Sequence, residues 1–245
     1  MNMENKRILC LTKGGSHAYG LSTPTSDTDY RGVFVNTDAA HLVGLKRDEI
    51  LVEQNEQHDT VMTEFRHALR MLRGANTQMV ELLYTDTFES VDPMWRYVQT
   101  FRQRLLDSAK LFSTLCGYMQ GELRLANGER TGKLGGKRKE AIDKYGFSPK
   151  NFVQYFRLSW AGIVYFRKGY FPVNVQKENP EYAATLLEIK TQPQKYTRDG
   201  LNEMAANADA NIKFAYDHRN HTTLFDEELV DNLCVQMYAP LIAAL

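Results

Sequence analysis

Two closely spaced carboxylates, Asp27 and Asp29, follow a Gly-Ser pair at Gly15 and Ser16. Side chains two residues apart in an extended segment point to one face, so both carboxylates can bind one divalent cation or bridge two. Ser16 can cap a helical turn, and free backbone N–H groups at the start of a helix favour anionic phosphate. These residues therefore predict a site for phosphate and metal.

Strands and a helical turn must position these residues. The apolar run Ile8 to Leu11 predicts a buried strand before the Gly-Ser pair, and Tyr30 to Val35 predicts a second strand directly after Asp29. The alternating run Asp59 to Phe65 predicts a third strand that passes into a helix. One face of that helix is apolar, and an arginine stripe along another face (Arg66, Arg70, Arg73) is a candidate phosphate clamp or a solvated surface.

The segment Gly15 to Val35, GSHAYGLSTPTSDTDYRGVFV, resembles the signature of the DNA polymerase beta superfamily of nucleotidyltransferases. It is similar, more narrowly, to the RNA repair pathway DNA polymerase beta family, whose members carry a closely related string. Glu64 to Leu83 also resembles a helix pair of that family. The resemblance implies an α+β fold, in which a mixed-sheet nucleotidyltransferase core is followed by a mainly helical C-terminal lobe.

The resemblance also implies roles for individual residues. Gly15 and Ser16 would contact the β- and γ-phosphates of a nucleoside triphosphate, with Lys13 and Arg66 as further candidates for nucleotide binding. Asp27 and Asp29 would be metal ligands and catalytic residues for two Mg²⁺ ions, which stabilise both ends of an in-line displacement. A third carboxylate would come from a later strand.

Asp59 and Glu64 are the two candidates for that third carboxylate. If the segment between them is extended, they face opposite sides of the sheet, so only one can approach Asp29. Glu64 stands where an acidic residue suits a helix N-terminus without any metal. We therefore expect Asp59 to be the third metal ligand and catalytic residue.

The chain of 245 residues is long enough for two lobes, and we expect a catalytic core over residues 1–90 and a helical lobe over residues 91–245. Asp92 and Pro93 fit the N-cap and first position of a long helix that runs to about Phe112. Four more helices are predicted: Lys150–Lys168, Glu181–Lys190, about Thr197–Tyr216, and Glu227–Leu245.

Thirty basic and thirty acidic residues cancel, so a nucleic-acid surface must be local. Residues 124–150 hold eight basic residues against three acidic ones, in what reads as a glycine-spaced loop. Contact with RNA and a plain surface loop are about equally supported. The residues that would contact RNA are Lys133, Lys137, Arg138 and Lys139.

Three widely spaced cysteines in apolar runs indicate reduced, buried thiols rather than disulfides or a zinc site. No apolar run approaches the roughly 20 residues that a membrane span needs. We therefore expect a soluble, cytoplasmic protein without membrane contact.

The leading hypothesis is a Mg²⁺-dependent nucleotidyltransferase that moves a nucleoside monophosphate from a triphosphate to an RNA or tRNA end. One alternative is a transferase that places AMP on a protein side chain, as antitoxin-type nucleotidyltransferases do. Another is a catalytically silent regulator that binds nucleotide or RNA, which the intact carboxylates disfavour. The donor base, the acceptor and the oligomeric state are left open.

Overall fold

The computed structural model describes residues 3–54, 58–129 and 136–245, which fall into two compact units. The first unit comprises Met1–Leu111 and Thr223–Leu245, and the second comprises Phe112–Thr222. This division differs from the expected boundary after residue 90. The chain returns to the first unit at Thr223, whose hydroxyl bonds Ser108 Oγ at 2.9 Å.

The first unit is built on a five-stranded mixed sheet in the order β3-β4-β2-β1-β5. β2 pairs antiparallel with β1 and parallel with β4, while β3 and β5 pair antiparallel with β4 and β1 at the two edges. The bounds of the strands are β1 Lys6–Lys13, β2 Thr28–Asn36, β3 Ile50–Gln54, β4 His58–Glu64 and β5 Ser90–Val91. The expected α+β fold is confirmed.

The central strand β2 has two different halves. Gly32 to Asn36 are buried on both faces, as the apolar run Val33 to Val35 predicts, whereas Thr28 to Arg31 are only partly buried. The accessible half of β2 therefore contains Asp29 and lies at the strand's N-terminal end.

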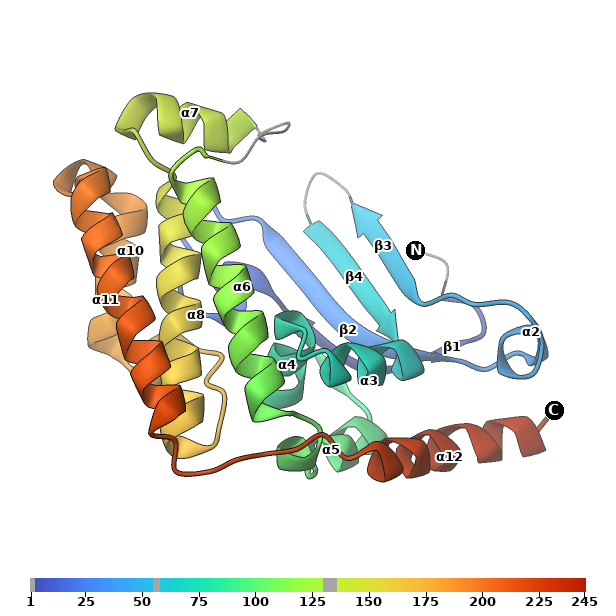
Figure 1. Cartoon of the computed structure of the whole chain (residues 1–245). Helices are drawn as coiled ribbons and strands as arrows, with labels where there is room; N and C mark the ends of the chain where they lie inside the picture. The colour runs from blue at the N-terminus through green and yellow to red at the C-terminus, as the bar shows by residue number, and fades with distance from the viewer. Residues whose placement is uncertain (1–2, 55–57, 130–135) are drawn as a thin grey trace. The chain divides into compact units, whose positions relative to one another are not determined.

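The longer helices of the first unit include α3 (Phe65–Arg73) and α4 (Thr77–Tyr84), which lie across one face of the sheet (Figure 1). The predicted apolar face of α3 is fully buried. The Asn76 side chain caps α4 by accepting from the N–H groups of Gln78 and Met79. The remaining helices of this unit are α1 Gly15–Ala18, α2 Ala39–Leu42, α5 Pro93–Gln99, the 3₁₀ turn η1 Arg102–Arg104, and α12 Glu227–Ala243.

The prediction of one long helix from Met94 to about Phe112 is wrong. The segment is divided into α5, η1 and a separate helix, α6 (Ser108–Ala126). The Asp107 carboxylate accepts from the N–H of Lys110 at 2.7 Å, so a new helix begins there with its own cap. Earlier in the chain, β3 reaches Gln54 and β4 begins at His58, with residues 55–57 outside the described part.

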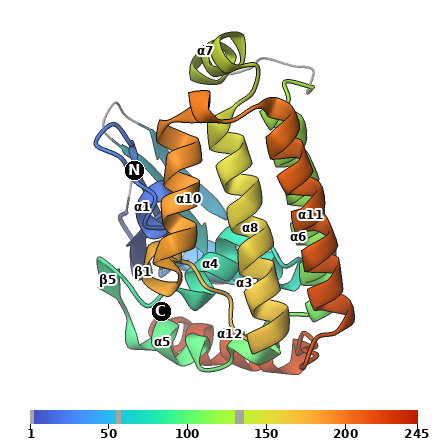
Figure 2. The same ribbon diagram turned by 90° about the vertical axis from the view of Figure 1, so that its left-hand side faces the viewer.

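The second unit is a helical bundle in which α8 (Pro149–Lys168), α10 (Pro180–Thr191) and α11 (Arg198–Asp217) run side by side with α7 (Gly136–Tyr145) across one end (Figure 2). Ser148, Asn179 and Thr197 are the N-cap residues of α8, α10 and α11, as their types predict. α6 continues into this unit, which also contains α9 (Val175–Glu178) and the turn η2 (Pro193–Lys195).

Gly162 on α8 shows why the bundle is tight. A side chain at this position would lie 2.6 Å from Ile212 Cδ1 and 3.0 Å from Leu115 Cδ1. α6, α8 and α11 therefore meet where one of them has no side chain.

No helix in the described ranges is both long and apolar enough to cross a membrane.

Candidate active site

The parallel pairing of β2 and β4 brings two carboxylates together. Asp29 and Asp59 are direct partners in the register, so their side chains lie on the same face of adjacent strands. Both residues are partly accessible. Their neighbours along the strands, Thr28 and His58, face the other side of the sheet.

The Gly-Ser turn folds directly onto Asp29. The N–H of Gly14 donates to the Asp29 carbonyl at 2.7 Å. Gly15 adopts a φ of +57°, and a Cβ at this position would lie well inside van der Waals contact with Asp29 Oδ2. Glycine is therefore required at position 15 for both conformation and space.

Ser16 does not cap the short helix α1, contrary to the sequence expectation. The N-cap is Gly14, which has extended geometry, and Ser16 is the second residue of the helix. The chain turns before Ser16 because Gly14 is fixed to Asp29. Ser16 nevertheless lies beside the glycine that contacts the Asp29 carboxylate.

Asp27 occupies a different position from Asp29. β2 begins at Thr28, so Asp27 lies one residue before the strand and is exposed. Within residues 3–54, 58–129 and 136–245, no group of three His, Cys, Asp or Glu side chains is arranged to hold a metal ion. The structure thus brings Asp29 and Asp59 together as a pair, without Asp27 as a third member of the group.

This donor pair fits Mg²⁺. Asp29 and Asp59 offer only carboxylate oxygens, which are the ligands that this hard cation prefers. Mg²⁺ is commonly held by one or two carboxylates, with water and substrate phosphates completing the shell. A carboxylate pair beside the glycine turn is consistent with that mode, in which the substrate supplies the missing oxygens.

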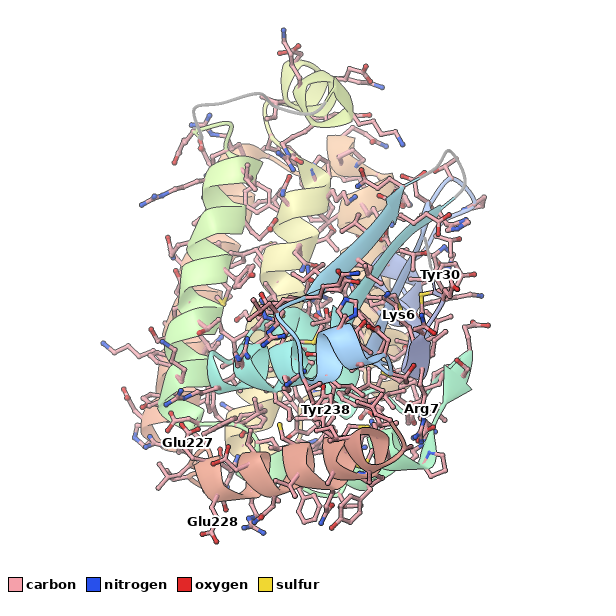
Figure 3. All side chains as sticks on the ribbon, turned by 90° about the vertical axis from the view of Figure 1, so that its right-hand side faces the viewer. Lys6, Arg7, Tyr30, Glu227, Glu228 and Tyr238 are labelled. Carbon is pink, nitrogen blue, oxygen red and sulfur yellow. The ribbon has the colours of Figure 1, made fainter. Side chains whose placement is uncertain are left out.

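Glu64 is engaged elsewhere. One of its carboxylate oxygens accepts from the N–H of His67 at the start of α3, and the other accepts from the hydroxyl of Tyr238. Its place in the register puts its side chain on the opposite face from Asp59. Burial and the Glu64 carboxylate raise the pKa of Tyr238, which keeps this hydroxyl protonated as a donor. Tyr238 points from α12 toward this junction (Figure 3).

The two cations predicted to bind nucleotide, Arg66 and Lys13, contact side chains other than Asp29 and Asp59. Arg66 stacks over the Tyr238 ring at 4.2 Å, with its Nε 3.8 Å from Glu64. Lys13 is the register partner of Tyr30, on the face opposite Asp29, and its ammonium lies 3.7 Å from Glu89. These contacts are with acidic or aromatic side chains of the first unit.

Arg31 is a cation near the pair that sequence reasoning missed. It stands two residues after Asp29 in β2, so its side chain lies on the same face. Its guanidinium donates to Gln78 of α4 at 3.1 Å. The period-two rule that linked Asp27 to Asp29 was sufficient to find it.

A second contact with α4 fixes the end of α1. The hydroxyl of Tyr19 donates to the buried Glu81 carboxylate at 2.9 Å. α4 therefore contacts the site twice, through Gln78 and through Glu81, one helical turn apart. No sequence signal pointed to α4 as the support of the Gly-Ser turn.

The basic segment is a helix where a loop was expected. Lys137, Arg138 and Lys139 lie in the first turn of α7, while Lys133 lies outside the described residues. Lys, Arg, Glu and Ala dominate this segment, and all are strong helix formers. Arg138 donates to Asn151 of α8 at 3.2 Å, so α7 is attached to the start of that helix.

A family model for the RNA repair pathway DNA polymerase beta family matches residues 1–236. The chain belongs to this family. It is accordingly a nucleotidyltransferase, and the match extends from the Gly-Ser signature through most of α12. The resemblance first carried by the segment Gly15 to Val35 is thereby confirmed.

Among solved structures, the chain is similar to a nucleotidyltransferase-like protein from Exiguobacterium sibiricum 255-15, with 11% identity and a TM-score of 0.32 over 86% of this chain and 69% of that one. This likeness is too distant to carry an argument about the site. A search of curated proteins gives no match.

Proposed function

We propose that this nucleotidyltransferase moves a nucleoside monophosphate from a triphosphate to the terminal hydroxyl of an RNA, such as a tRNA end, and that it requires Mg²⁺. The observation that carries the proposal is the contact between Asp29 and Gly15, with Asp59 beside Asp29 in the register. It places acidic oxygens directly against the turn of the nucleotidyltransferase signature.

Asp29 and Asp59 would hold Mg²⁺, and the exposed Asp27 one residue before β2 is our third candidate ligand. When bound, Mg²⁺ supplies charge stabilisation at the attacking and leaving oxygens. The chain's own contribution is to hold both carboxylates on adjacent strands, whose backbone hydrogen bonds fix their separation. Asparagine at either position would keep the shape and remove the charge.

Gly15 and Ser16 would bind the phosphates of the donor. Gly15 and Ser16 are the first two residues of α1, where backbone N–H groups favour an anion, and the Ser16 hydroxyl is a further hydrogen-bond donor. Lys13 and Arg66, proposed from the sequence as nucleotide-binding residues, have partners in Glu89, Glu64 and Tyr238. We therefore favour Gly15 and Ser16 over these two cations.

RNA is the acceptor that the family description favours. The cations at the start of α7 support this choice, because Lys137 and Lys139 are exposed and Arg138 is held by Asn151. Lys133 belongs to the same proposal. Nucleoside triphosphates and RNA are both available in the cytoplasm, which we propose as the location of the reaction.

The test is label transfer. The purified protein is incubated with each of the four α-labelled NTPs and Mg²⁺, together with total RNA or with the proteins of a cell lysate. Label in RNA supports the proposal and names the donor base. Label confined to protein favours the AMP-transferring alternative, and label in neither fraction contradicts an RNA acceptor.

A further inference from the structure

We propose that Arg31 binds the phosphates of the donor nucleotide, as a second contact beside Gly15 and Ser16. The inference rests on the proposed function, because it names a residue of the same site. Its basis is the position of Arg31 between the carboxylate pair, the glycine turn and α4.

The register puts Arg31 on the correct face. In β2, Asp29 and Arg31 alternate with Tyr30, so both side chains leave the sheet on one side. Arg31 pairs with Thr12 of β1, one residue before the strand end that leads into the glycine turn. A cation at this position lies next to where anionic oxygens would meet Asp29 and Asp59.

Gly14 leaves room for the Arg31 side chain. A Cβ at Gly14 would lie 3.1 Å from Arg31 Cγ, 3.2 Å from Nε and 3.3 Å from Cδ. The stem of Arg31 therefore runs along the backbone of Gly14, immediately before Gly15. Gly14 thus accommodates the arginine, and Gly15 accommodates the Asp29 carboxylate.

Gln78 orients the guanidinium without neutralising it. The Gln78 amide oxygen accepts from one terminal nitrogen of Arg31 at 3.1 Å. Several other arginines of the first unit pair with a carboxylate: Arg7 with Asp92, Arg70 with Glu49, Arg73 with Glu227 and Arg104 with Asp226. In the part of the chain that the structure describes, no carboxylate forms such a pair with Arg31.

This environment suits a phosphate better than a structural role. The planar guanidinium presents several N–H groups in a fixed fork that matches phosphate oxygens. A neutral amide at one nitrogen fixes the plane and leaves the positive charge to be balanced by an incoming anion. The chemical class of the ligand is therefore a di- or triphosphate group, the part of an NTP that a monophosphate lacks.

The test measures nucleotide binding rather than transfer. Calorimetry with an α,β-methylene triphosphate and with the matching monophosphate is run in the presence of Mg²⁺ on wild type, Arg31→Gln, Arg31→Lys and Arg47→Gln. Arg47 is the matched control, since it is exposed and, among the residues that the structure describes, its guanidinium donates to backbone oxygens of its own loop. Arg31→Gln should weaken the triphosphate about tenfold to a hundredfold and the monophosphate by much less. The affinity of Arg31→Lys for the triphosphate should lie between those of wild type and Arg31→Gln, and the affinity of Arg47→Gln should match that of wild type.

Gln78→Ala gives an independent reading if Arg31→Gln folds poorly. It leaves the guanidinium in place but removes the hydrogen bond that orients it, so it should weaken triphosphate binding in the same direction by a smaller factor. If wild type binds the triphosphate and either Arg31→Gln or a folded Gln78→Ala binds it with the same affinity, the inference about Arg31 is overturned while the proposed function stands. Wild type that binds no triphosphate would overturn the proposed function and the inference together.

Discussion

The carboxylate of Asp29 occupies the space in which a side chain at Gly15 would lie. The same glycine has a φ of +57°, in the region that side chains disfavour. Two signals that are separate in the sequence, the Gly-Ser pair and the Asp-x-Asp pair, therefore describe one contact.

Replacing Gly15 by alanine should disturb this contact twice. The left-handed backbone would cost about 1 kcal/mol of folding stability, and the new methyl group would displace the Asp29 carboxylate. We expect transfer activity to fall by much more than the fraction of folded protein. Thermal unfolding and label transfer on the same sample separate the two effects.

Gly121→Ala is the matched control. Gly121 lies within α6, and a Cβ there would have nothing within 4 Å. This change should stabilise the helix by about 0.5 to 1 kcal/mol and leave transfer unchanged. Equal activity in Gly15→Ala and Gly121→Ala would mean that Asp29 does not need its present position.

Asp59 and Glu64 should respond in opposite ways to loss of charge. Asp59→Asn should abolish most transfer with little change in stability, because its partner in the register is the carboxylate Asp29. Glu64→Gln should lower the free energy of unfolding by about 1 to 3 kcal/mol, because Glu64 caps α3 and accepts from Tyr238. Its transfer rate per folded molecule should stay near that of wild type. An inactive but folded Glu64→Gln beside an active Asp59→Asn would reverse the assignment.

Acid should weaken the attachment of α12 through Asp226. The N–H of Leu229, and then the guanidinium of Arg104, hold the pKa of this carboxyl below its ordinary value of 3.8. Because the pKa is lower in the folded state, the Asp226 carboxylate makes its full contribution to folding stability above pH 3.8. This contribution is lost as the pH falls through the lower pKa of the folded state. The difference in Tm between wild type and Asp226→Asn should therefore be largest near neutral pH and shrink below pH 3.8. A difference that stays constant down to pH 2 would show that the charge of Asp226 contributes nothing.

The basic start of α7 should matter for RNA and not for NTP. Neutralising Lys137, Arg138 and Lys139 to Gln should weaken RNA binding and reduce the slope of log affinity against log salt by up to about 0.7 for each lost phosphate contact. The control is a triple change of exposed lysines elsewhere in the second unit: Lys168, Lys177 and Lys213. The RNA contact would be refuted if both triple variants gave the same affinity and salt slope.

The sequence predicted what depends on local pattern. The caps at Asn179 and Thr197 and the buried face of α3 follow from residue type and spacing, and all are present. The carboxylates and the Gly-Ser pair were found because their spacing has a direct chemical meaning. Their functional roles stay predictions.

What the sequence did not predict depends on tertiary contacts. The start of α6 at Ser108, which bonds Thr223, and the grouping of α12 with the sheet through Tyr238 and Glu64 involve partners far apart in the chain. The contact of Arg31 with Gln78 is of the same kind. Such pairs have no periodicity that a single sequence can reveal.

The most direct test of the carboxylate pair as the centre of the reaction is label transfer from NTP to RNA as a function of Mg²⁺ concentration, in wild type and in Asp29→Asn. Removing one charge with little change in volume should lower transfer by orders of magnitude at saturating Mg²⁺. The melting temperature without Mg²⁺ should stay level or rise, because repulsion between Asp29 and Asp59 is relieved. Wild-type transfer that needs no divalent cation, or full activity in Asp29→Asn, would contradict the carboxylate pair as the centre of the reaction.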